Sequence, residues 1–151
     1  MECHVRLATN KDVAAISRVV LAALRESNSQ DYPPGVIAQV EQSFAPEVIS
    51  AQLLKRRVFV ALLGEAIIGT ASLDGDVVRS VFVDPVHQKG GIGRRLMDVI
   101  HATAARAGVK AVRVPSSITA ETFYAALGYQ KIRDTFHGAE RTIVMEKRLQ
   151  D

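Results

Sequence analysis

Three glycines lie close together in residues 88–93, between an apolar run and a pattern typical of a helix. The first turn of a helix has backbone N–H groups without partners inside the helix, and its dipole places partial positive charge at the same end. Gly90, Gly91 and Gly93 have no Cβ and can adopt positive φ, so successive amides can converge on one anion. The segment therefore predicts a site for a diphosphate.

Lys89, Arg94 and Arg95 add cations around these glycines, although the three side chains could also be an ordinary solvated helix face. The loop itself could be only a turn that begins a buried helix. It is not a P-loop, because no Gly-Lys followed by Ser or Thr is present. It is not the dinucleotide fingerprint either, because Leu96 occupies the position of the third glycine.

Two motifs at a defined separation give the loop a context. Gln-x-x-Gly-x-Gly at residues 88–93 follows Val-Phe-Val-Asp-Pro, and Phe-Tyr-Ala-Ala-Leu-Gly-Tyr at residues 123–129 begins about thirty residues later. With these motifs the chain resembles the GCN5-related N-acetyltransferase (GNAT) superfamily over nearly its whole length. The resemblance implies one N-acetyltransferase domain over residues 1–151 that uses acetyl-CoA as co-substrate.

The resemblance also implies how the cofactor binds. Residues 88–93 match the family's pyrophosphate loop. In the family, the strand before this loop and the strand after the next helix are parallel and splay apart, which leaves the backbone of Val81 and Val83 free for the pantetheine arm. Phe82 then faces the other side of the sheet. Thr119 stands where the family often has Asn, and it can donate a hydrogen bond or cap its helix. The implied cofactor-binding residues are Val81, Phe82, Val83, Gln88, Lys89, Gly90, Gly91, Ile92, Gly93, Arg94 and Thr119.

Tyr124 receives the role of general acid from the resemblance. When an amine attacks the acetyl thioester, the leaving thiolate has an ordinary pKa of about 8–9, and a phenol of pKa near 10 can hydrogen-bond or protonate it. On the helical pattern alone, Tyr124 could instead be a core aromatic beside Phe123. Tyr129 is expected to pack against the end of the helix.

The general base is left open. Many family members carry Glu on the strand before the loop, at the position that is Arg79 here. Water, a backbone carbonyl, Asp31, His137 or Glu140 could take the proton of the amine. Arg79 could face an acidic group on the acceptor, or it could be a solvent-facing strand residue.

The acceptor site is expected under the connection that follows the first helix. In this fold the connection covers the acetyl end, so residues 32–35 and a helix carrying Phe44 are expected to wall the pocket. A linker turn and core packing are the plain alternatives for these two segments. The implied substrate residues are Tyr32, Phe44 and Arg79.

Hydrophobic periodicity and turn residues give the order of the elements. A capping box of Thr9 and Asp12 is expected to start the first helix, and Thr119 to cap the last one. Other helices are expected over 36–43, from Pro46 onward, and over 94–107. The expected strands are 3–8, 58–63, 66–73, 76–84, 109–114, 131–137 and 141–149. The predicted fold class is therefore α/β, with a mixed, largely antiparallel sheet of about seven strands between helices in a three-layer sandwich.

Composition agrees with one enzyme domain of 151 residues, 48% hydrophobic and 23% charged. The net charge is +3 and only 5% of the residues are aromatic, so no nucleic-acid groove is expected. Residues 1–4 begin no export signal and no apolar stretch approaches a membrane span, so a cytoplasmic protein without a membrane partner is expected. Cys3 is the only cysteine, and the histidines at 4, 87, 101 and 137 lack metal-ligand spacing, so no metal is expected.

The predicted reaction is acetyl transfer from acetyl-CoA to a primary amine of a small molecule, by direct attack in a ternary complex. The acceptor is not identified by the sequence, and a homodimer is left open. One alternative is a protein N-terminal or lysine acetyltransferase. Another is a non-catalytic acyl-CoA-binding regulatory module, which the absence of the Glu would favour and Tyr124 would not.

Overall fold

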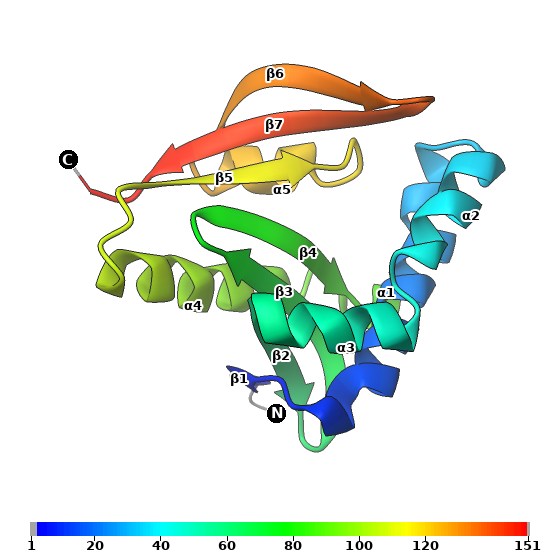
Figure 1. The fold of residues 1–151 in the computed structure, drawn as a ribbon, viewed down its shortest axis with the longest axis horizontal. Coiled ribbons are helices and arrows are strands. Elements are labelled where there is room, and N and C mark those ends of the chain that lie inside the picture. The colour runs from blue at the N-terminus through cyan, green and yellow to red at the C-terminus, as the bar shows by residue number, and fades with distance from the viewer. Residues whose placement is uncertain (1–2, 151) are drawn as a thin grey trace.

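The computed structural model describes residues 3–150, and its seven strands form one sheet in the order β1-β2-β3-β4-β5-β7-β6 (Figure 1). The prediction about an export signal concerned residues 1–4, and two of these, Met1 and Glu2, lie outside the described residues. All neighbouring strands are antiparallel except β4 and β5, which are parallel. The strands are β1 (Cys3–Leu7), β2 (Arg57–Leu63), β3 (Ala66–Asp74), β4 (Val77–Val83), β5 (Ala111–Ser116), β6 (Gln130–His137) and β7 (Glu140–Arg148).

Helices cover both faces of this sheet (Figure 1). The helices are α1 (Val13–Glu26), α2 (Pro34–Gln42), α3 (Pro46–Lys55), α4 (Ile92–Arg106) and α5 (Glu121–Ala126), with short 3-10 helices η1 (Asn10–Asp12), η2 (Asn28–Gln30) and η3 (Pro85–His87). Side chains of α1, α2 and α3 share one core cluster, and those of α4 and α5 share the other. The predicted three-layer α/β sandwich is confirmed. None of the described helices is long and apolar enough to cross a membrane.

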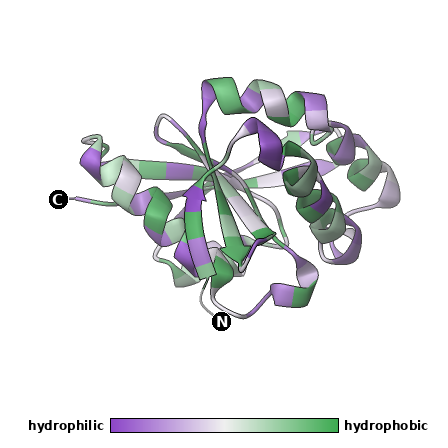
Figure 2. Cartoon of the chain, turned by 90° about the horizontal axis from the view of Figure 1, so that it is seen from below, coloured by the Kyte–Doolittle hydropathy of each residue, from purple (hydrophilic) through white to green (hydrophobic). Residues whose placement is uncertain are grey.

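Strand β2 shows how the sequence builds two cores from one sheet. Val58, Val60 and Leu62 pack in the cluster with α1, whereas Phe59 and Ala61 pack in the cluster with α4. Successive side chains of a strand point to opposite faces, so a strand covered on both sides is apolar throughout. Hydrophobic and hydrophilic residues alternate along the surrounding helices (Figure 2). This pattern is typical of helices that pack one face and expose the other.

Several predicted boundaries were wrong for local reasons. β5 begins at Ala111 rather than at residue 109, because the amide of Val109 donates to Ala104 O and belongs to the end of α4. α2 begins at Pro34, since proline fits the first turn of a helix. Thr119 does not cap α5, because Ala120 holds the N-cap position without a side-chain cap.

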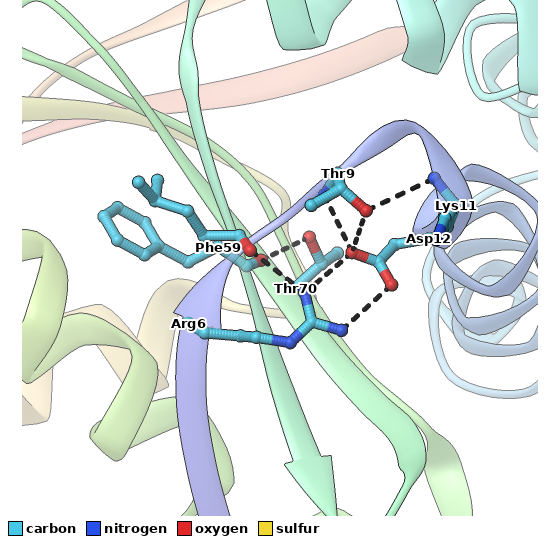
Figure 3. Close-up of polar contacts among 7 residues, drawn as sticks. Arg6, Thr9, Lys11, Asp12, Phe59 and Thr70 are labelled. Atoms are coloured by element: carbon cyan, nitrogen blue, oxygen red, sulfur yellow. Dashed lines mark hydrogen bonds and ion pairs between the residues drawn. The ribbon is translucent and has the colours of Figure 1, made fainter.

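The predicted capping box at the start of the first helix is confirmed (Figure 3). The amide of Thr9 donates to Asp12 Oδ2 at 2.8 Å, and Arg6 donates to both carboxylate oxygens at 2.8 and 3.1 Å. The side chain of Asp12 is 8% exposed. The bonds from Arg6 and from Thr9 hold the pKa of Asp12 below its ordinary value, against the opposing effect of burial. This cluster joins β1 to α1.

We expect Asp12→Asn to lower the free energy of unfolding by about 1–3 kcal/mol, because it leaves the Arg6 guanidinium without its carboxylate and weakens the cap. Urea denaturation followed by circular dichroism measures the change. Glu41→Gln is the matched control, since it breaks the exposed ion pair between Arg25 and Glu41 and should have a smaller effect.

The pH dependence of this contribution has a defined sign. The pKa of Asp12 is lower in the folded chain than in the unfolded chain, so the stabilisation is complete above the unfolded value of about 4 and is lost as pH falls below it. The difference in stability between wild type and Asp12→Asn should therefore shrink between about pH 4 and pH 2. A constant difference across that range would contradict this assignment.

Candidate active site

β4 and β5 separate from one another along their length. Only Val77 and Arg113 are paired in register between them. Beyond this pair a cavity of about 1060 Å³ opens, lined by both strands, by α1 and α2, and by the loop before α4. Its volume slightly exceeds the roughly 300–1000 Å³ that is typical of small-molecule sites. The predicted splay of two parallel strands is present in the structure.

The backbone of Val81 and Val83 faces this cavity. The amide of Asp84 donates to Ile68 O at 2.8 Å, and Phe82 is paired with Thr70 of β3. Backbone groups of successive strand residues point to opposite edges, so Val81 and Val83 direct theirs away from β3 and toward β5. The side chain of Phe82 packs edge-to-face on Phe44, with ring centroids 5.3 Å apart. The backbone of Phe82 is thus engaged with β3, and its ring lies on the other side of the sheet, as predicted.

Ser80 and Val81 form a β-bulge in β4. Arg79 stands opposite Ser72 and Phe82 opposite Thr70, so Ser80 and Val81 together face Ala71 alone. Ser80 has a φ of +56°, which is uncommon for a residue other than glycine. A bulge of this kind bends its strand and redirects the side chains around it. The bend occurs where the cavity opens.

The loop before α4 presents a set of unused amides. Among the described residues, none of the backbone amides of residues 89–94 donates to a protein acceptor. Lys89 has a φ of +67° and Gly91 a φ of +83°, so two left-handed residues turn the chain around this point. Gln88 fixes the loop to β4, because its side-chain amide donates to Val83 O at 3.1 Å and accepts from Ser27 at 3.3 Å. Free amides at the N-terminus of a helix can bind an anion.

Two of the three predicted cations lie at this site and one does not. Lys89 and Arg94 line the cavity. Arg95 instead donates to Cys3 O at 2.7 Å, on the side of α4 that meets β1. The helix turns each residue by about a quarter of a circle, so neighbouring arginines point in different directions. The inclusion of Arg95 in the cluster was wrong.

Gly93 serves the packing of the site. A Cβ at this position would lie 3.1 Å from the ring of Phe123, which is closer than ordinary van der Waals contact. The small residue lets α4 approach α5, the helix that carries Tyr124. Gly91 is different, because a Cβ there meets no protein atom within 4 Å and would point into open space.

Tyr124 is held by aromatic neighbours. It is 3% exposed and packs edge-to-face on Phe123 and on Tyr129, with centroids 5.1 and 5.4 Å apart. Its hydroxyl has no hydrogen-bond partner among the described residues, and Tyr124 is one of the residues that line the cavity. Burial raises the pKa of Tyr124 well above 10. The phenol therefore stays protonated and available as a donor.

Tyr32 and Asp31 tie the first connection to the opposite wall of the cavity. The hydroxyl of Tyr32 accepts from the amide of Ile118 at 2.7 Å and donates to Arg141 O at 2.9 Å. Thr119 donates to Asp31 at 2.8 Å. Burial raises the pKa of Tyr32, and these bonds keep its hydroxyl occupied. Tyr32 thus forms part of the cavity wall, and the hydroxyl of Thr119 is engaged in its hydrogen bond to Asp31.

The remaining predicted acceptor residues also border the cavity. Phe44 does so from the turn between α2 and α3, so the expectation of a helix carrying it was wrong. Arg79 lines the cavity and lies 3.7 Å from Asp74. Of the three side chains left open as bases, His137 and Glu140 line the cavity, whereas the carboxylate of Asp31 is bonded to Thr119. The described residues contain no group of His, Cys, Asp or Glu placed to hold a metal ion.

Sequence reasoning missed two polar residues of the site. Ser27, at the end of α1, meets Gln88, and Arg56, directly after α3, meets Ser80. Each pair brings together segments that are far apart in the chain. Neither residue belongs to a motif, so the sequence carried no signal for them.

Comparison with known proteins agrees with this geometry. The model of the acetyltransferase (GNAT) domain family matches residues 26–149. YafP of Escherichia coli K12, described as an uncharacterized N-acetyltransferase, is 26% identical over 125 residues, which cover 81% of this chain and 77% of that protein.

Solved structures show the same fold. A GCN5-related N-acetyltransferase from Rhodopseudomonas palustris has a TM-score of 0.92 at 21% identity, over 98% of this chain and 96% of that one. The PaiA N-acetyltransferase of Thermoplasma acidophilum in complex with coenzyme A has a TM-score of 0.84 at 16% identity, over 98% and 99%. YncA of Salmonella typhimurium with acetyl-CoA has a TM-score of 0.66 at 23% identity, over 99% and 95%. Because the family model spans most of the chain, this protein belongs to the GNAT family of N-acetyltransferases and is an acyltransferase.

Proposed function

We propose that the chain binds acetyl-CoA in the cavity between β4 and β5 and transfers the acetyl group to a primary amine of a small molecule in a ternary complex. The observation that carries this proposal is the run of unused amides at residues 89–94 beside the open edge of β4. The diphosphate is bound by these amides with Lys89 and Arg94. The pantetheine arm is bound by the backbone of Val81 and the amide of Val83, since the carbonyl of Val83 accepts from Gln88. The solved structures of PaiA with coenzyme A and YncA with acetyl-CoA support it.

The chain's own groups suit the transfer step. The nitrogen lone pair of the neutral amine attacks the thioester carbon, a C–N bond forms, and the C–S bond breaks with its electron pair on sulfur. Tyr124 donates a hydrogen bond to that sulfur. Since burial raises the pKa of Tyr124 far above that of a thiol, hydrogen bonding to the thiolate is favoured over full proton transfer. The ammonium proton leaves to Glu140, His137 or water before attack. After the C–N bond forms, the nitrogen releases a second proton, which passes to water or to the departing thiolate.

A small acceptor is favoured by the wall of the cavity. Three hydrogen bonds from Asp31 and Tyr32 join the first connection to the segment before α5 and to β7. This bridge narrows the approach to the acetyl end, whereas a protein substrate needs an open groove.

Two further predictions are untested. They are that the chain is a single domain and that it resides in the cytoplasm.

The test is turnover of acetyl-CoA with a mixed panel of small amines and lysine-containing peptides. The release of free thiol measures the turnover. We expect thiol release with at least one small amine and none with peptides alone. Turnover restricted to peptides would contradict a small-molecule acceptor and would indicate that the acceptor is a protein. Coenzyme A binding without turnover of any amine or peptide would identify a non-catalytic binding module.

A further inference from the structure

Two arginines lie together at the β-bulge, away from the glycine loop. Arg56 follows α3 directly, and its Nη1 lies 3.4 Å from Ser80 Oγ. Arg79 is the residue before Ser80 in β4. Both side chains line the cavity, and they are close enough for the charge of Arg79 to act on Arg56. The bulge therefore brings two guanidinium groups to one polar region of the wall.

The charge of this pair is incompletely balanced. Arg79 Nε lies 3.7 Å from Asp74 Oδ2, and both of these side chains are more than 40% exposed, so the ion pair is a weak one. Among the described residues, no carboxylate lies within ion-pair distance of Arg56. Burial lowers the pKa of Arg56 and the charge of Arg79 lowers it further, while Asp74 acts in the opposite direction. Arginine stays charged under such conditions, so two guanidiniums share one carboxylate.

The pair is distant from the site expected to bind the diphosphate. Val83 lies four residue steps beyond Arg79 along β4, which corresponds to at most about 13 Å along a strand. Lys89 and Arg94 lie beyond Val83, at the start of α4. The cavity thus has two positively charged regions, one at each end of the exposed edge of β4. One diphosphate cannot occupy both.

We propose that Arg56 and Arg79 together bind an anionic group of the acetyl acceptor, a carboxylate or a phosphate, so that the acceptor is an anionic small-molecule amine. Guanidinium groups bind planar carboxylates and phosphates through paired hydrogen bonds. The positive charge also repels polyamines and lysine-rich chains. This inference rests on the proposed function, because it places the anion on the co-substrate of acetyl transfer.

Matched acceptors test the inference. Each charged amine is compared with its neutral counterpart: an amino acid with its amide, and a phosphorylated amino alcohol with the free amino alcohol. For the preferred pair we expect kcat/KM to be at least tenfold higher with the charged amine than with the neutral one. This charged-to-neutral ratio of kcat/KM should fall about tenfold in Arg56→Gln and in Arg79→Gln. The pair that shows the effect distinguishes a carboxylate from a phosphate.

Arg57→Gln is the matched control. Arg57 is adjacent to Arg56 in sequence, but its side chain is exposed and does not line the cavity. The ratio should not change in this variant. A preference for neutral or polycationic amines, or an unchanged ratio in both Arg56→Gln and Arg79→Gln, would overturn the inference.

A binding experiment separates this inference from the proposed function. The protein is saturated with coenzyme A, so that the glycine loop is occupied, and is titrated with acetate and with inorganic phosphate while the arginine side-chain N–H signals are followed by NMR. We expect saturable shifts of the Arg56 and Arg79 signals with at least one anion, and none for Arg57. Absence of these shifts refutes the anion site whether or not any amine is acetylated. Failure of coenzyme A to bind refutes the proposed function. The same titration of the free protein then shows whether Arg56 and Arg79 bind an anion.

Discussion

Gly91→Val should weaken coenzyme A binding at least tenfold, or about 1.4 kcal/mol. A Cβ at this position meets no protein atom within 4 Å, so the new side chain occupies the open space above the amides of residues 89–94. That space is where we place the diphosphate. Calorimetric titration of the folded variant with coenzyme A measures the effect.

Backbone strain is the competing explanation, and Gly108→Val is a matched control for it. Gly108 has the same φ of +83°, and a Cβ there also meets nothing within 4 Å, but it lies beyond the other end of α4 and outside the cavity. Both substitutions force a β-branched residue into a left-handed conformation, so they should destabilise the fold similarly. Equal affinities for coenzyme A in the two variants would remove the diphosphate from this loop.

Much of the fold could be predicted because its signals are local. The apolar run of β2, the capping box of Thr9 and Asp12, and Pro46 at the start of α3 each depend on a few neighbouring residues. The predicted position of β5 was two residues early, because the end of α4 uses Val109 for its own hydrogen bonding. Helix ends depend on which carbonyls remain unpaired, and a hydrophobic pattern does not report this.

The site was predictable only where a motif marked it. The motifs single out the glycine loop and Tyr124, which line the same cavity, while their roles stay predictions. The bond of Thr119 to Asp31 and the approach of Arg56 to Ser80 join positions 88 and 24 residues apart. Such pairs arise from the packing of whole elements, so the local sequence around one residue does not predict its partner.

The bulge at Ser80 shows the same limit within one strand. The sequence of β4 reads as one continuous strand, yet Ser80 and Val81 both face a single residue of β3. A shift of this kind changes which side chains reach the cavity, because side-chain direction alternates along a strand. The proximity of Arg79 to Arg56 could therefore be read only from the structure.

Tyr124→Phe should lower the rate constant of acetyl transfer roughly ten- to hundredfold, because the hydroxyl acts on charge that develops at sulfur and matters more in the transition state than in the ground state. Coenzyme A affinity should change little. The hydroxyl has no protein partner among the described residues, so its removal should alter the free energy of unfolding by less than about 1 kcal/mol. Single-turnover kinetics with saturating acetyl-CoA and acceptor measure the rate constant.

Tyr129→Phe separates a chemical role of Tyr124 from the packing of its ring. Tyr129 is equally buried, packs on Tyr124, and lies outside the cavity lining, with its hydroxyl 2.7 Å from His101 Nε2. This control should lose stability, since the imidazole loses its partner, but should retain the rate constant of transfer. If Tyr124→Phe retained the wild-type rate constant, Tyr124 would be a core aromatic. If both variants slowed transfer equally, the packing of the three rings would account for the loss, and the hydroxyl of Tyr124 would have no separate part in the reaction.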